Sequence, residues 1–124
     1  MTSNVRIATS QDVAFFYADE ERPKVAVRAV IGEVDGNPVV LGGVAHSRGA
    51  FVAFMNMKPG AQSHARLIMQ ATRKAADEIF TKYRAPIYAY KEEGLESADR
   101  YLRHIGFIPL EDGGEVYIWQ RQSR

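Results

Sequence analysis

The sequence predicts an α/β (α+β) fold, in which a mixed β-sheet carries helices on its faces. Alternating apolar runs separated by glycine-containing turns fill the first half, and a long amphipathic stripe follows them. After that stripe comes another strand-like run, so the strands on either side of the central helix are expected to run parallel. The predicted order is β-α-β-β-β-α-β-α-β-β. With 124 residues, the chain is expected to form one domain, residues 1–124.

Composition narrows the classes of function. Hydrophobic residues make up 46% and charged residues 25%, which is typical of a globular protein. The net charge of +1 gives no bulk electrostatic case for binding nucleic acid or a membrane surface. Cysteine is absent, and the three histidines show no ligand spacing, so no metal site is expected. Without an apolar signal core or a membrane-length apolar run, we expect a cytoplasmic protein.

The first half reads as four strands and one short helix. Residues 5–8 form the first predicted strand, and the hydroxyls of Thr9 and Ser10 cap the helix after it. Three further strands, joined by turns, are predicted over residues 25–34, 39–46 and 51–57. Gly42 and Gly43 interrupt the second of these three, which indicates a bulge or a close backbone approach.

The second half begins with a long helix, predicted over residues 63–83. Its apolar residues share one face at the helical period: Leu67, Ile68, Ala71, Ala75, Ile79 and Phe80. A strand is predicted over residues 87–91. A second apolar helical stripe then ends at Gly106, in the position of a C-cap glycine, and consists of Leu95, Ala98, Tyr101, Leu102 and Ile105. Residues 107–110 and 115–120 form a terminal hairpin.

With these segments the chain resembles the GNAT superfamily of acyl-CoA-dependent N-acyltransferases over nearly its whole length. The family's opening strand and helix are matched by VRIATSQDV, and its glycine-containing hairpin by GEVDGNPVVLGGVA. The strand, loop and helix that hold coenzyme A in the family are matched by MNMKPGAQSHARLI, and its final helix by ESADRYLRHIGF. The resemblance implies a splayed parallel strand pair, acetyl-CoA or another acyl-CoA as co-substrate, and a small-molecule or protein amine as acceptor.

The expected acyl-CoA site lies at the junction between the strand and the long helix. First-turn N–H groups and the helix dipole favour an anion there. The residues expected to contact the ligand are Met57, Gln62, Ser63, His64 and Ala65. The family places a glycine where this chain has Ser63, and only Ala65 matches its loop pattern. Ser63 and His64 narrow the approach of a pyrophosphate but supply a hydroxyl and an imidazole as donors.

The candidate catalytic residues are His46 and Tyr90. His46 could act as a base because histidine titrates near neutrality, and its alternative is a surface residue beside a turn. Tyr90, together with Tyr88, could reach a cleft as an acid, and the alternative is strand packing. Leu102 stands where some family members have a tyrosine acid, and Leu95 replaces a common asparagine. Those two chemical roles therefore do not transfer to this chain.

Two functions follow from these observations. The first is an N-acetyltransferase that acts on an unidentified amine. The second is a non-catalytic GNAT-fold structural or interaction protein, with or without coenzyme A binding, similar to GNAT-like proteins of tailed bacteriophages. The departures of the loop and of Leu102 from the family pattern favour the second, and the order of elements favours the first. An exposed terminal hairpin also predicts a homodimer.

Overall fold

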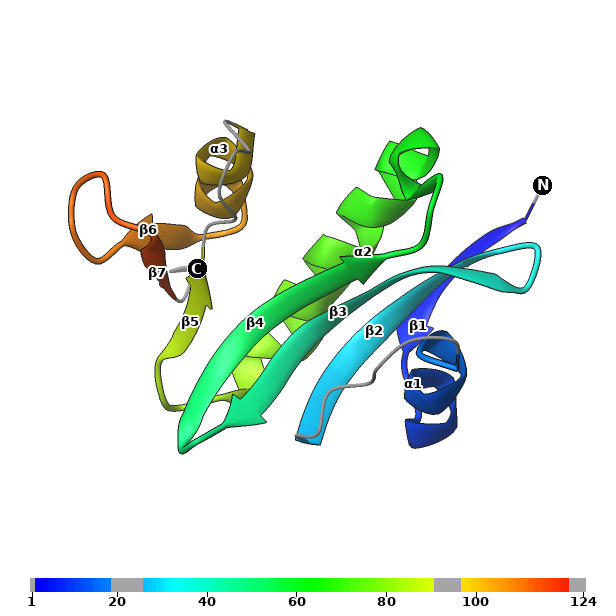
Figure 1. Ribbon diagram of the computed structural model, residues 1–124, viewed down its shortest axis with the longest axis horizontal. Helices are drawn as coiled ribbons and strands as arrows, with labels where there is room; N and C mark the ends of the chain where they lie inside the picture. Colours follow the sequence, from blue (N-terminus) through cyan, green and yellow to red (C-terminus); the bar gives the residue numbers. More distant parts are fainter. Residues whose placement is uncertain (1, 19–25, 91–96, 121–124) are drawn as a thin grey trace.

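The computed structural model describes residues 2–18, 26–90 and 97–120. The first half contains β1 (Ser3–Ile7), α1 (Ser10–Phe16), β2 (Ala26–Val34), β3 (Asn37–Ser47) and β4 (Ala50–Met57). The second half contains the 3₁₀ helix η1 (Ala61–His64), α2 (Ala65–Glu78), η2 (Phe80–Lys82), β5 (Ile87–Tyr90), α3 (Ser97–His104), β6 (Phe107–Pro109) and β7 (Val116–Trp119). This order confirms the predicted one (Figure 1). The predictions that fall on Val25, Lys91 and Leu95 lie outside the described residues.

The strands form one seven-stranded sheet in the order β1-β2-β3-β4-β5-β7-β6. Neighbouring strands are antiparallel except for β4 and β5, which run parallel as expected. Their register covers only Phe51 with Ile87 and Val52 with Tyr88. Beyond these pairs the two strands diverge, and Figure 1 shows the resulting V, which widens toward their C-terminal ends. The splayed parallel pair is thereby confirmed.

The helices cover opposite faces of the sheet. On one face, α2 lies across β1, β2 and β3, and its apolar stripe packs on a buried cluster that includes Val30, Val40 and Val44. On the other face, Phe16 and Tyr17 of α1 pack on Ala29, Ile31 and Leu41. Because side chains alternate along a strand, the two clusters take alternate residues of β2 and β3. Two apolar layers therefore hold the antiparallel half of the sheet.

The central helix is shorter than predicted. The range 63–83 contains α2 together with part of η1 and the whole of η2, so the prediction of one continuous helix is wrong at both ends. At the N-terminal end Gly60 has φ +85°, and the Ala61 N–H donates to the Lys58 carbonyl at 3.0 Å. At the other end the Tyr83 N–H donates to the Phe80 carbonyl at 3.2 Å. Such i+3 bonds tighten the backbone into 3₁₀ turns at helix ends.

The glycine pair of β3 marks a close approach between two backbones. A Cβ at Gly43 would overlap the Arg28 carbonyl oxygen and lie 2.6 Å from the Ala29 Cα. The register shift in this part of the sheet falls between Gly32 and Glu33. Of the two interpretations of the pair, the close approach is therefore the one that the structure supports. Because Gly43 has no side chain, β2 and β3 can remain paired at this point of the sheet.

This close approach predicts a large cost for a single methyl group. We expect Gly43→Ala to lower the free energy of unfolding by about 3 kcal/mol, since two backbones would have to separate. Gly49→Ala is the control, because its Cβ would lie in open space at φ +79° and should cost only about 1 kcal/mol. Urea unfolding followed by circular dichroism measures both. Equal losses would contradict the close approach.

Candidate functional site

The space between the diverging strands is a cavity of about 650 Å³. Its walls come from β4 and β5 on the two sides of the V, while α2 and α3 close it from one face of the sheet. Two exposed residues, Met57 at 49% and Tyr90 at 63%, lie at its open end. Two buried residues, Ala75 at 4% and Phe107 at 0%, lie at its inner end. The cavity therefore runs from the surface at the tips of the V into the core.

Backbone groups along the V are available to a ligand. Among the residues that the structure describes, no strand pairs with the edge of β4 that faces β5 beyond Val52. β5 pairs with β7 along its other edge, through Tyr88 with Ile118 and Tyr90 with Val116, which, in the described part of the chain, leaves the edge that faces β4 open beyond Tyr88. N–H and C=O groups at an open strand edge need other partners. A ligand that contains amides can lie between the strands and pair with such groups, as an added strand would.

The predicted junction site follows the open end of β4. Met57 lies on the cavity wall, whereas Gln62, Ser63 and Ala65 are exposed in the segment that leads into α2. The Ser63 hydroxyl donates to the Gly60 carbonyl at 2.8 Å, and its N–H donates to the same oxygen at 3.2 Å.

His64 is half-buried and stands at the N-cap of α2, where no side chain caps the helix. The first turn of α2 therefore has no side-chain acceptor at its N-terminus. An anion can take that place.

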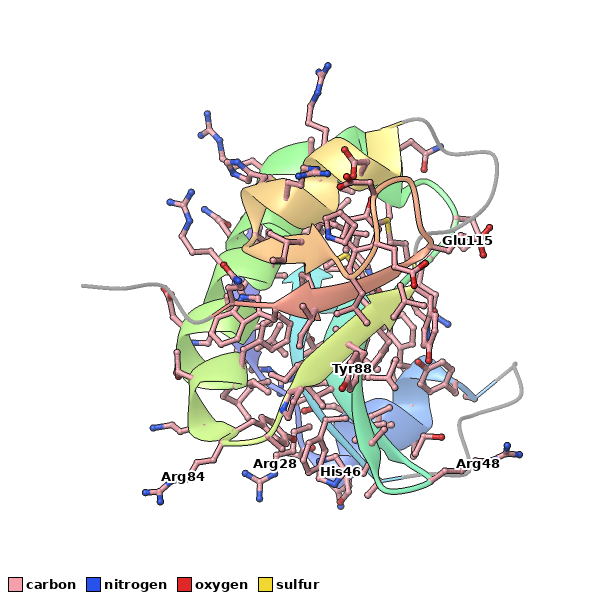
Figure 2. The ribbon with its side chains drawn as sticks, turned by 90° about the vertical axis from the view of Figure 1, so that its left-hand side faces the viewer. Arg28, His46, Arg48, Arg84, Tyr88 and Glu115 are labelled. Atoms are coloured by element: carbon pink, nitrogen blue, oxygen red, sulfur yellow. The ribbon has the colours of Figure 1, made fainter. Side chains whose placement is uncertain are left out.

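The two catalytic candidates lie at different ends of the molecule. Tyr90 lines the cavity, but His46 does not. His46 Nε2 is 2.7 Å from the Tyr83 hydroxyl, and its ring packs edge-on against Phe51, where β4 and β5 are still paired. In Figure 2, His46 lies at the lower end with Arg28, while α3 is at the top. The structure thus places His46 outside the cavity that Tyr90 lines.

No protein-family model and no curated protein sequence matches the chain. A solved structure does match: the crystal structure of the ribosomal-protein-S18-alanine N-acetyltransferase from Escherichia coli. The two structures superpose with a TM-score of 0.62 at 12% sequence identity, over 94% of this chain and 91% of the other. The chain has the GNAT fold. At this level of identity the likeness establishes the fold, and the chemistry must be argued from the residues.

Within this GNAT fold, α3 directs a tyrosine into the cavity. The Tyr101 hydroxyl is hydrogen-bonded to Thr72 Oγ1 and lies 3.5 Å from Met55 Sδ. Thr72 Oγ1 also donates to the Ile68 carbonyl at 2.8 Å, and the Tyr101 hydroxyl donates to Met55 Sδ. Burial is the main reason why the pKa of Tyr101 is raised, and the bond to Thr72 acts in the opposite direction. The phenol therefore stays protonated beside the V.

Sequence reasoning missed this pair. It assigned Tyr101 to packing and noted only that Leu102 stands where the family can have a tyrosine acid. In the structure both residues line the cavity, because neighbouring helix positions are about 100° apart and a wide cavity reaches both. The signal in the sequence was Thr72, a polar residue on the apolar stripe of the central helix. It is buried and contacts the Tyr101 hydroxyl.

A basic rim on α3 was also missed. Arg100 and His104 are four residues apart, so they share one face of the helix, and both are exposed and line the cavity. Basic side chains at the mouth of an apolar cavity are suited to the phosphate groups of a ligand whose other end is apolar.

The described part of the chain also bears on metal binding and on membrane spans. No group of three or more histidine, aspartate or glutamate side chains gathers there in a way that could hold a metal ion. No helix among the same residues is long and apolar enough to cross a membrane.

The buried position of Tyr101 predicts that its phenol has a raised pKa. Since burial disfavours the phenolate, we expect Tyr101 to lose its proton above the ordinary tyrosine pKa of about 10. Ultraviolet difference titration of the wild type against Tyr101→Phe isolates this one phenol. Tyr90→Phe, which removes an exposed phenol, serves as the control for the spectral change. A Tyr101 midpoint at or below about pH 10 would contradict the buried position.

Proposed function

We propose that the protein binds an acyl-CoA, with acetyl-CoA as the reference ligand, and transfers the acyl group to an amine. The observation that carries the proposal is the cavity of about 650 Å³ that opens where β4 and β5 part. Its volume lies within the range of small-molecule sites, and its mouth is next to the N-terminus of α2. The likeness to an N-acetyltransferase of the same fold supports the transferase class.

The two ends of coenzyme A suit different parts of the site. The amides of the pantetheine arm suit the open backbone edges of β4 and β5. The phosphates suit the uncapped first turn of α2 together with Arg100 and His104 on the rim. Gly60 keeps the loop backbone accessible, since nothing lies within 4 Å of the place where its Cβ would stand. The Ser63 hydroxyl already donates to the loop carbonyl, so it contributes less to anion binding than its sequence position suggests.

The reaction needs a proton at the leaving group. The amine nitrogen attacks the thioester carbonyl carbon, the C–S bond breaks, and the amine loses a proton while the thiolate gains one. Tyr101 is our candidate for the proton donor, because its hydroxyl faces a sulfur atom, Met55 Sδ, inside the cavity. A phenol with an ordinary pKa of about 10 is protonated at neutral pH, and burial raises the pKa of Tyr101 further. N–H groups on the open edge of β4 can stabilise the oxyanion of the tetrahedral intermediate.

One observation favours the alternative, a GNAT-fold module that binds without turnover. Among the described residues, the cavity wall contains no carboxylate, and its only imidazole is His104 on the exposed rim. His46 is bonded to Tyr83 outside the cavity. The amine therefore has no base inside the described site and must arrive neutral or lose its proton to solvent. Binding and catalysis have to be tested separately.

Calorimetry with acetyl-CoA tests binding. We expect Ser63→Glu to weaken binding at least tenfold, because a carboxylate at the junction would repel the pyrophosphate. Ser10→Glu makes the same change in the first turn of α1, on the other face of the sheet, and should leave the affinity unchanged. Absence of heat and of a thermal shift at millimolar ligand would refute the cofactor proposal. Equal affinity in both variants would place the ligand elsewhere.

Thiol release tests catalysis. With a panel of amines and acetyl-CoA, we expect an amine-dependent release of free thiol. Tyr101→Phe should lower kcat about 100-fold with little change in KM, because it removes the proton donor and leaves the cavity shape intact. Tyr83→Phe, which removes a phenol outside the cavity, is the matched control. Binding without release for every amine would support the non-catalytic alternative, and an unchanged kcat in Tyr101→Phe would exclude this tyrosine as the donor.

A further inference from the structure

We propose that the inner part of the cavity is a pocket for an acyl chain longer than acetyl, of about hexanoyl to octanoyl length. This inference rests on the proposed function, because it concerns the ligand of the same site. It begins from a difference between the two ends of the cavity. The outer end lies along open strand edges and beside Arg100 and His104, whereas the inner end is formed by buried apolar side chains.

The inner end offers no polar partner to a ligand. Its wall includes Ala75, Phe80, Ile105 and Phe107, of which all but Ile105 are buried. The nearest polar side chains, Thr72 and Tyr101, are hydrogen-bonded to each other. No buried polar side-chain atom of the described residues lacks a hydrogen-bond partner. A group that enters this end therefore gains only from burial of hydrocarbon.

Small side chains leave the inner space open, and aromatic rings close it. Ala75 and Ala89 face the cavity where larger residues would fill it. At its end Phe80 packs edge-on against Phe107, with ring centroids 5.8 Å apart, and against Trp119 at 5.4 Å. Phe80 and Phe107 line this end of the cavity, and Trp119 supports Phe80 from behind. Aromatic rings therefore close the inner end.

The length can be gauged along α2. Thr72, which is bonded to Tyr101 at the proposed position of the thioester, and Phe80, at the inner end, line the same cavity. Between them α2 continues from Thr72 to its last residue, Glu78, which is six positions or about 9 Å along the helix axis. An acetyl group is far shorter than this distance, and an extended octanoyl chain is close to it. Met55, beside Tyr101, adds a flexible wall at the point where the alkyl chain would begin. An acetyl group would leave much of the apolar space unfilled, which forfeits contacts that a longer chain makes.

Calorimetry with free coenzyme A and with its acetyl, butyryl, hexanoyl, octanoyl and palmitoyl thioesters tests the chain pocket. We expect affinity to rise with chain length, by up to about fourfold per buried methylene, to a maximum at hexanoyl or octanoyl. Palmitoyl-CoA should bind more weakly than the best ligand, because the aromatic wall ends the pocket.

Two variants test whether the acyl chain binds in the cavity. Ala75→Leu at the inner end should remove most of the gain of octanoyl-CoA over acetyl-CoA and leave acetyl-CoA binding within about twofold. Leu102→Phe narrows the same space from α3 and replaces Ala75→Leu if that variant does not fold. Ala14→Leu, on the exposed side of α1, adds the same side chain away from the cavity and should change neither affinity.

The outcomes separate the two proposals. Binding of coenzyme A with equal affinity for every chain length overturns the acyl-chain pocket and leaves the proposed function standing. A chain-length gain that survives both cavity variants also overturns the pocket, since the chain then binds elsewhere. Failure of every thioester and of coenzyme A itself to bind refutes the proposed function and, with it, the pocket.

Discussion

β4 and β5 share only two residue pairs, Phe51 with Ile87 and Val52 with Tyr88, and the site of this protein depends on that short contact. A parallel pair that continued to Met57 would close the V and fill the cavity with backbone. Beyond these two pairs β5 follows β7, on its other side, and β4 follows β3 to its end. The open edges, the cavity and the neighbouring helix N-terminus all follow from this divergence.

The site combines two kinds of environment that rarely suit one ligand. Unpaired strand edges and a basic rim favour a polar, anionic group, while the inner end accepts only hydrocarbon. A thioester of coenzyme A has this division along its own length. In the complex that we propose, the ligand and the cavity would change from charged to apolar in the same direction, without the glycine-rich loop that the family pattern would place before α2.

Periodicity and turn residues predicted most of the fold. Alternation of apolar residues predicted the strands β2 to β4, and the apolar stripe predicted the helix α2. The order of elements predicted that β4 and β5 run parallel. The ends of α2 were missed, because they depend on the paths of the connecting segments. Gly60 shapes the connection from β4, and the 3₁₀ turn η2 shapes the connection to β5. Gly43 was noticed, but its partner, the Arg28 carbonyl, could not be known without the pairing register.

The site was less predictable than the fold, since it is assembled from contacts between distant residues. The bond of His46 with Tyr83 spans 37 positions and that of Thr72 with Tyr101 spans 29, and no local pattern encodes either. The first bond turns a candidate base away from the cavity, and the second places an overlooked hydroxyl in it.

The brief pairing of β4 with β5 also has a mechanical meaning. The sheet consists of a four-stranded part, β1 to β4, and a three-stranded part, β5 to β7, joined by backbone bonds at one end of a single strand pair. The cavity lies between the two parts, beyond the end at which they are paired. A molecule bound there would contact both parts of the sheet. It would connect them where the backbone does not, so the sheet would be more rigid with the ligand than without it.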